Sequence, residues 1–140
     1  MRKRITVIDG QGGKMGAALI ARLTELGVHA DIYAVGTNAA ASSAMAKGAA
    51  GVATGEGAVK YAARRSDVIV GPVGIVIADS LLGEITPEMA AAVGQSDAVK
   101  ILLPVNRCRA KVVAVKSLSF GDMIEEAARE AIKALENEEI

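Results

Sequence analysis

The chain has few of the side chains on which catalysis and cofactor chemistry most often depend. Its 140 residues include one cysteine, one histidine, two tyrosines, one phenylalanine and no tryptophan. One cysteine cannot form an internal disulfide, and no cluster of histidine and cysteine indicates a metal site. The 16 basic and 16 acidic side chains give a formal net charge of zero. Nucleic-acid-binding proteins usually carry a basic excess, so this balance argues against that class.

Long apolar runs are also missing. No stretch of about 18 apolar residues occurs, so we expect no membrane-spanning segment. The basic start at residues 1–4 is similar to a signal peptide, but Asp9 and the glycines after it end the apolar run too soon. We therefore expect a cytoplasmic protein. The length and the 51% share of hydrophobic residues predict a single domain spanning residues 1–140.

Strand and helix patterns alternate along the chain. Short β-branched runs predict strands, and apolar residues at helical spacing predict helices between them. The predicted strands are 5–8, 31–35, 51–54, 67–70 and 99–103, and the predicted helices are 15–26, 38–47, 57–65, 86–94 and 121–136. A sixth strand is predicted over 111–115. The connection that precedes it is too short for a helix, so it should run antiparallel to strand 99–103.

This alternation predicts an α/β fold: a single Rossmann-like domain with a mostly parallel, doubly wound sheet of order 3-2-1-4-5 and an antiparallel edge strand. The stretch 73–85 is unusually apolar for a connection. It could be a short strand, a lid over a ligand or an oligomer contact. We expect a homo-oligomer, either a dimer or a tetramer, with 73–85 and 111–115 as the contacts.

The glycine-rich segment after the first strand is the strongest functional signal. It reads Gly10-Gln11-Gly12-Gly13-Lys14-Met15-Gly16 and opens the first helix. Glycines let the backbone approach a ligand, and a helix N-terminus favours phosphate. The dinucleotide fingerprint G-x-G-x-x-G is not met, because Met15 stands at the third glycine position. The segment predicts nucleotide or phosphate binding, and the alternative is a tight turn without a ligand.

Two resemblances bear on this segment. Gly13-Lys14-Met15-Gly16 is similar to the cofactor loop of dihydrodipicolinate reductases, over about the first 25 residues. Those enzymes carry their catalytic groups on a second domain, for which this chain is too short. The whole chain more closely resembles a family of short bacterial proteins of unknown function. The shared segments are Val7–Gly13, Gly36–Asn38, Ser43–Met45, Ala53–Glu56, Gly71–Ile75, Leu82–Pro87 and Leu103–Cys108. This resemblance implies the fold and a common site, but no activity.

The cofactor stays open. An NAD site normally has an acid at the end of the second strand, where this chain has Thr37 and Asn38. Asp31 begins that strand and so lies at the opposite edge of the sheet. Thr37 and Asn38, with Ser42 and Ser43, could bind the 2′-phosphate of NADP, although no arginine accompanies them. Asn38 could equally be a plain helix cap. NADP or NAD is therefore possible.

Further candidates follow the fourth and fifth strands, at the edge where ligands of such sheets bind. They are Gly71, Pro72, Gly74, Asn106 and Arg107. Arg107 could clamp a phosphate or lie unremarkably at the edge of the sheet.

Two more side chains near this edge are ambiguous. Cys108 could be a nucleophile, although a lone cysteine is more often a small buried side chain. Asp9 could bind a ligand or cap its own turn.

These observations predict a small-molecule-binding protein, a sensor or accessory protein that holds a nucleotide or phosphorylated ligand on the glycine-rich segment. The first alternative is a small NAD(P)-dependent reductase or transferase. Its catalytic groups would come from Asp9, Glu84 or Cys108, with the site shared across a dimer. The second alternative is a structural or interaction protein without a ligand. Neither a catalytic residue nor the presence of a reaction can be assigned from the sequence.

Overall fold

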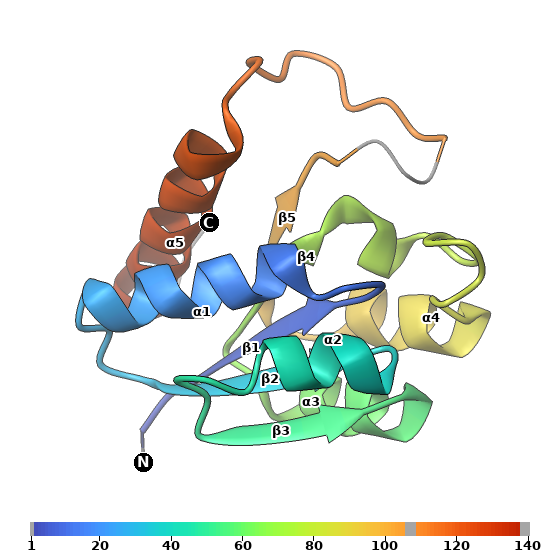
Figure 1. The fold of residues 1–140 in the computed structure, drawn as a ribbon, viewed down its shortest axis with the longest axis horizontal. Coiled ribbons are helices and arrows are strands. Elements are labelled where there is room, and N and C mark those ends of the chain that lie inside the picture. Colours follow the sequence, from blue (N-terminus) through green and yellow to red (C-terminus); the bar gives the residue numbers. More distant parts are fainter. Residues whose placement is uncertain (1, 106–108, 138–140) are drawn as a thin grey trace.

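The computed structural model describes residues 2–105 and 109–137, which form a parallel five-stranded sheet between two layers of helices (Figure 1). The strand order is β3-β2-β1-β4-β5, as predicted, and all four pairings are parallel. The strands are β1 (Arg4–Asp9), β2 (Asp31–Gly36), β3 (Gly51–Thr54), β4 (Val68–Pro72) and β5 (Val99–Leu103). The order reverses between β1 and β4, where ligands bind in folds of this class.

The helices lie where the apolar spacing predicts them. They are α1 (Lys14–Glu25), α2 (Ala39–Ala44), α3 (Glu56–Arg65), α4 (Pro87–Gln95) and α5 (Phe120–Asn137), with the short 3₁₀ helix η1 (Val73–Val76) after β4. Asn38 and Thr86 cap α2 and α4 with side-chain oxygens that accept backbone N–H groups. None of the described helices is both long enough and apolar enough to cross a membrane.

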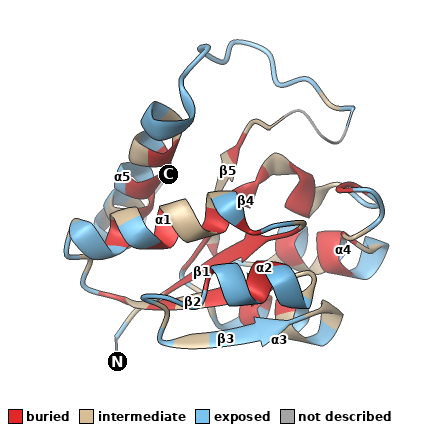
Figure 2. Ribbon diagram, in the orientation of Figure 1, coloured by how far each residue is buried: buried red, intermediate tan, exposed pale blue. Residues whose placement is uncertain are grey.

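Each face of the sheet has its own apolar core. On the α1 and α5 face, Val7 and Val70 pack with Leu19 and Ala128. The other core consists of side chains from the sheet, η1, α3, α4 and the residues before α4, among them Ile8, Ile69, Ile75, Val59 and Met89. The central strands are therefore buried on both sides, as parallel sheets require (Figure 2).

The predicted antiparallel strand over 111–115 is wrong. In the part of the chain that the structure describes, no strand lies beyond β5. Ala114 has a left-handed backbone with φ of 63°, which interrupts an extended strand. Val113 is 85% exposed and its neighbour Val112 is 49% exposed, so this segment has no buried face. Alternating valines predict a strand only when a partner covers one side.

The apolar stretch 73–85 is neither a strand nor an open loop. It begins with η1 and continues through a series of turns, and it places Ile75, Leu81 and Ile85 in the core beside α4. We call its turn-forming part, residues 77–84, the strap. Burial of these three side chains accounts for the apolar composition, and the strap carries its polar residues to the carboxyl edge of the sheet.

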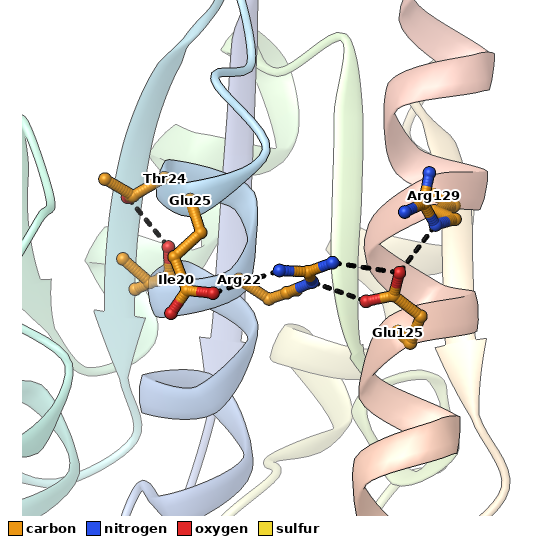
Figure 3. Close-up of polar contacts among 6 residues, drawn as sticks. All are labelled: Ile20, Arg22, Thr24, Glu25, Glu125 and Arg129. Carbon is orange, nitrogen blue, oxygen red and sulfur yellow. Dashed lines mark hydrogen bonds and ion pairs between the residues drawn. The ribbon is translucent and has the colours of Figure 1, made fainter.

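Ion pairs and hydrogen bonds between charged side chains connect α5 to α1 (Figure 3). The guanidinium of Arg22 donates two hydrogen bonds to the carboxylate of Glu125, one of them from Nη2 at 3.1 Å, and a third to Glu25. Arg129 donates to Glu125 from the next turn of α5 at 2.6 Å. Because Arg22 and Arg129 both hydrogen-bond to it, the pKa of Glu125 is lowered to about 2. The hydrogen bonds that Arg22 donates to Glu125 and Glu25 raise the pKa of Arg22.

Candidate functional site

The glycine-rich segment forms the turn between β1 and α1, as predicted. Gly13 donates its N–H to the carbonyl of Gly10 at 3.0 Å and is the N-cap of α1. Gln11 and Gly13 both have left-handed backbones, with φ of 50° and 71°. The turn lies at the carboxyl edge of the sheet, beside the end of β2.

Asp9 lies buried beneath this turn and caps it. One carboxylate oxygen accepts the N–H of Gly10 at 2.8 Å, and the other accepts the N–H of Gly16 at 2.7 Å. Burial raises the pKa of Asp9 above its ordinary value, against the opposing effect of the hydrogen bonds from Gly16 and Gly10, and the charge of Glu84 raises it further. Capping by Asp9 leaves two amides of the turn occupied by the protein itself.

Three of the four glycines are explained by packing inside the protein. A Cβ atom on Gly10 would lie 2.7 Å from Thr37 Oγ1, and one on Gly13 would lie 2.7 Å from the carbonyl oxygen of Ala41. A Cβ atom on Gly16 would overlap the buried side chain of Met45. These clashes account for the G-x-x-G-x-x-G spacing without a ligand.

Gly12 is different from the other three. It is exposed, its φ is not positive, and a Cβ atom there would meet no atom within 4 Å. Neither packing nor backbone conformation requires glycine at this position. The same is true of Gly57, Gly94 and Gly121, so the fold alone does not account for glycine at these positions.

The acid that the end of β2 lacks is supplied by the strap. Glu84 reaches across from residues far along the chain, and its Oε1 accepts three hydrogen bonds. The donors are the N–H of Gln11 at 2.8 Å, the hydroxyl of Thr37 at 2.5 Å and the side-chain amide of Asn38 at 3.0 Å. Burial raises the pKa of Glu84, but these hydrogen bonds outweigh it and hold the pKa below its ordinary value. These hydrogen bonds therefore favour the charged form of the Glu84 carboxylate.

Asn38 joins the two sides of this arrangement. Its Oδ1 accepts the N–H of Ala41 at 2.8 Å and so caps α2, while its Nδ2 donates to Glu84 and, at 3.0 Å, to the carbonyl of Gln11. The helix cap that the sequence offered as the alternative at this position is therefore present, and the same side chain also contacts Glu84. Ser42, another candidate, bonds inward to Thr54 and to backbone carbonyls.

The glycines after β4 serve the packing beneath the strap. Gly71, Pro72 and Gly74 are all buried, and a Cβ atom on Gly71 would overlap the carbonyl oxygen of Ile8. The buried hydroxyl of Ser80 donates to the carbonyl of Gly74 at 2.5 Å, which fixes the strap over η1. These three candidates lie at the predicted edge of the sheet but support the strap and expose no surface to a ligand.

The remaining candidates divide between described and undescribed residues. Lys14 is exposed, and its Nζ lies 5.7 Å from the centre of the Phe120 ring. Met15 packs against the core beneath α1. Asn106 and Arg107 lie outside the residues that the structure describes, together with Cys108. No group of three or more potential metal ligands occurs among the described residues.

The sequence predicted a ligand site at Gln11, Thr37 and Asn38 but did not bring Glu84 to them. It named Glu84 only as one possible source of a catalytic group. The available signal was the apolar stretch 73–85, which was too apolar for a solvent-exposed connection and carried one glutamate next to its buried end. Turn conformations in the strap decide where that glutamate lies, and composition does not encode them.

Comparisons with known proteins give a family and a distant structural likeness. The family model described as "Domain of unknown function (DUF3842)" matches residues 4–136. No curated protein matches the chain. Among solved structures, the chain is similar to a dodecameric FMN-dependent UbiX-like decarboxylase from Escherichia coli O157:H7. That match has 13% identity and a TM-score of 0.45, and covers 94% of each chain.

Proposed function

The chain belongs to this family of unknown function, and we propose that it binds a phosphorylated small molecule, of nucleotide type, at the carboxyl edge of its sheet. The site consists of the exposed part of the glycine-rich turn, the end of β2 and the strap. A phosphate oxygen of the ligand takes the place that Glu84 Oε1 occupies in the structure.

The observation that carries this proposal is the convergence of three donors on one oxygen. Gln11, Thr37 and Asn38 come from two loops and point an amide, a hydroxyl and a carboxamide at the same atom. One anionic oxygen with three donors is the arrangement by which proteins bind phosphate. Here the protein's own carboxylate is the anion, so the arrangement is already competent to bind one.

Displacement of Glu84 requires little rearrangement. Leu81 and Ile85 anchor the strap in the core on either side, so only the glutamate side chain has to rotate away. The strap itself is strained, because Asp79, Leu81 and Leu82 all have left-handed backbones, with φ of 65°, 56° and 57°. Such conformations cost about 1–2 kcal/mol per residue and occur preferentially at functional sites. The strain supports a functional role for the position of Glu84.

The remaining phosphate oxygens would face the exposed turn. Gly12 leaves room for a ligand to approach the backbone, and Lys14 at the start of α1 provides a nearby positive charge. The N-terminus of α1 adds a partial positive charge to the same region. Asp9 lies behind the turn and accepts the N–H groups of Gly10 and Gly16. These two amides therefore do not bind the ligand, and the phosphate is expected at the N–H of Gln11.

A second candidate function is supported by the other oxygen of Glu84. No hydrogen bond to Oε2 comes from any described residue, and the carboxylate lies at the end of β2, where NAD sites hold the ribose hydroxyls. In that case Glu84 stays in place and binds a ribose of NAD or NADP directly. The two candidates make opposite predictions for removal of Glu84.

The binding proposal is tested with AMP and adenosine, which differ by the phosphate alone. We expect AMP, and not adenosine, to raise the melting temperature of the chain by mass action. Thr37→Val removes one donor and keeps the shape of the side chain. Because Glu84 uses the same donor when no ligand is bound, the effect is measured in the Glu84→Ala chain. A hydrogen bond to a charged group contributes about 1.5–3 kcal/mol, so adding Thr37→Val to that chain should weaken AMP binding about tenfold or more in calorimetry.

Thr24→Val provides the matched control, because Thr24 lies exposed on α1 and donates only to its own helix, at Ile20. Added to Glu84→Ala, it should leave the affinity for AMP unchanged. Equal stabilisation by AMP and adenosine, or equal affinities for AMP when Thr37→Val and Thr24→Val are each added to Glu84→Ala, would contradict the phosphate site.

A further inference from the structure

Residues 109–118, which precede α5, leave the body of the molecule and remain uncovered, and we call them the arm. Figure 1 shows the arm arching to the start of α5, and Figure 2 shows it exposed along nearly its whole length. Its apolar side chains are not buried: Val113 is 85% exposed, Val112 49% and Val115 47%. Clustered exposed apolar side chains of this kind mark interaction surfaces.

A groove lies between the arm and the body of the protein. It has a volume of about 960 Å³. Its inner walls are β5 with the residue that follows it and one face of α5, and they include Ile101, Leu103, Pro104, Met123 and Ala127. The arm forms only the outer wall. The inner walls are therefore largely apolar, with Glu126 and Glu130 also on the α5 side, and the chain's own arm leaves the groove open.

The same groove borders an unpaired edge of the sheet. β5 pairs with β4 on one side, and no described residue pairs with its other side as a strand. Exposed strand edges present backbone N–H and C=O groups that readily accept another extended segment. An extended, valine-rich segment is suited to this edge, and the arm is such a segment.

Opposite charges lie on the two sides of the groove. The arm carries Lys111 and Lys116 and has no acidic residue, while Glu126 and Glu130 lie on the α5 wall. No hydrogen bond or ion pair joins any of these four side chains to another described residue. The lysines of the arm and the glutamates of α5 are complementary in charge, but they are not paired with each other within one chain.

We propose that a second copy of this chain fills the groove with its arm and receives this chain's arm in return. The valines of each arm cover Ile101, Leu103 and Met123 of the other copy. Lys111 and Lys116 pair with the partner's Glu126 and the partner's Glu130. One chain carries both the unburied arm and the unfilled groove, so a two-fold dimer satisfies both surfaces at once.

The attachment of the arm to α5 helps to explain why it does not fill its own groove. Phe120 lies beside Lys14 of α1, and Ser119 caps the first turn of α5. These contacts fix the end of the arm that leads into α5, and the arm lies as the outer wall of the groove.

Charge reversal in the full-length chain tests the exchange. The arm variant is Lys111→Glu with Lys116→Glu, and the groove variant is Glu126→Lys with Glu130→Lys; all four side chains are exposed. We expect the unaltered chain to sediment as a dimer at micromolar concentration. Each variant alone should dissociate at least about tenfold more readily at low ionic strength, because like charges then face each other at both contacts.

Mixing the two variants is the decisive step. In a mixed dimer the reversed arm meets the reversed groove, and the original arm meets the original groove, so the equimolar mixture should recover the dimer. Folding of each variant is checked by circular dichroism. Recovery is possible only if the arm of one copy contacts the groove of the other.

Two controls complete the experiment. Lys47→Glu with Lys60→Glu reverses two exposed charges away from the arm and should leave the dimer intact. Val113→Asp should weaken association, whereas Val52→Asp on β3, at a side chain 43% exposed, should not. An unaltered chain that is monomeric at these concentrations, or variants that fail to recover the dimer when mixed, would overturn the proposal.

Discussion

Gly12 and Gly13 are neighbours in the sequence, but the structure requires glycine only at Gly13. Its φ is +71°, and a Cβ atom there would lie 2.7 Å from the backbone of Ala41, which cannot move aside. At Gly12 the φ is ordinary and the space is open. The sequence presents these positions as equivalent members of one glycine-rich turn. Their roles separate only when the chain packed against them is known.

This difference predicts opposite outcomes for two alanine substitutions. Gly13→Ala should lower the free energy of unfolding by at least about 2 kcal/mol, from the left-handed backbone and the overlap together. Gly12→Ala should change it by less than about 0.5 kcal/mol and yet weaken AMP binding. Urea denaturation and calorimetry measure the two effects. Equal stabilities of the two variants, or unchanged affinity of Gly12→Ala for AMP, would contradict these roles.

Residue-level prediction from the sequence succeeded where the side chain acts locally. Asn38 caps the helix that follows it, and Asp9 caps its own turn, because each uses backbone groups within a few residues. Glu84 acts on residues more than 40 positions away. Its role depends on a series of left-handed turn residues, and no sequence rule assigned these to Leu81 and Leu82.

At the level of elements, the charged contacts between α1 and α5 hold the last helix on the sheet. The pKa of Glu125 is lowered to about 2 from an ordinary value of 4.5. A group with a lowered pKa stabilises the fold above its ordinary value, and this contribution is lost as the pH falls toward the folded-state pKa. The contribution of Glu125 should therefore disappear between pH 4.5 and about 2.

Glu125→Gln tests this contribution. We expect its unfolding midpoint in urea to lie below that of the unaltered chain above pH 4.5, and the difference to shrink as the pH falls toward about 2. High salt should also reduce the difference, because these side chains are partly exposed. Glu136→Gln, on an exposed position of the same helix, should leave the pH dependence unchanged. A difference that stays constant with pH would rule out the charged contact as its cause.

The surroundings of the strands explain why five of them could be predicted from the sequence and the sixth prediction was wrong. Each strand of the sheet is buried against helices or paired on its edges, so its β-branched residues have the environment that the pattern presumes. The arm is equally rich in valine, but among the described residues of one chain no strand pairs with it. A pattern of side chains indicates a tendency to pair, and the partner has to be present for a strand to form.

For the whole molecule, the parallel sheet and its order follow from the alternation of elements and from the handedness of the crossovers. These rules correctly placed the glycine-rich turn and the end of β2 on one edge, and the structure shows that the strap reaches the same edge. They do not predict which group binds the hydrogen-bond donors at this edge. In the structure it is the carboxylate of Glu84, held by the same donors that we propose for the ligand.

The most direct test of this account is the affinity of Glu84→Ala for AMP, measured by titration calorimetry. Removal of a competing carboxylate frees three donors, so we predict binding at least about tenfold tighter than in the unaltered chain. In a parallel NMR titration, the resonance of the backbone amide of Gln11 should shift with AMP and not with adenosine. Glu88→Ala, at an exposed carboxylate in the first turn of α4, should bind AMP as the unaltered chain does. Weaker binding by Glu84→Ala would contradict the account and favour direct contact between Glu84 and a ribose.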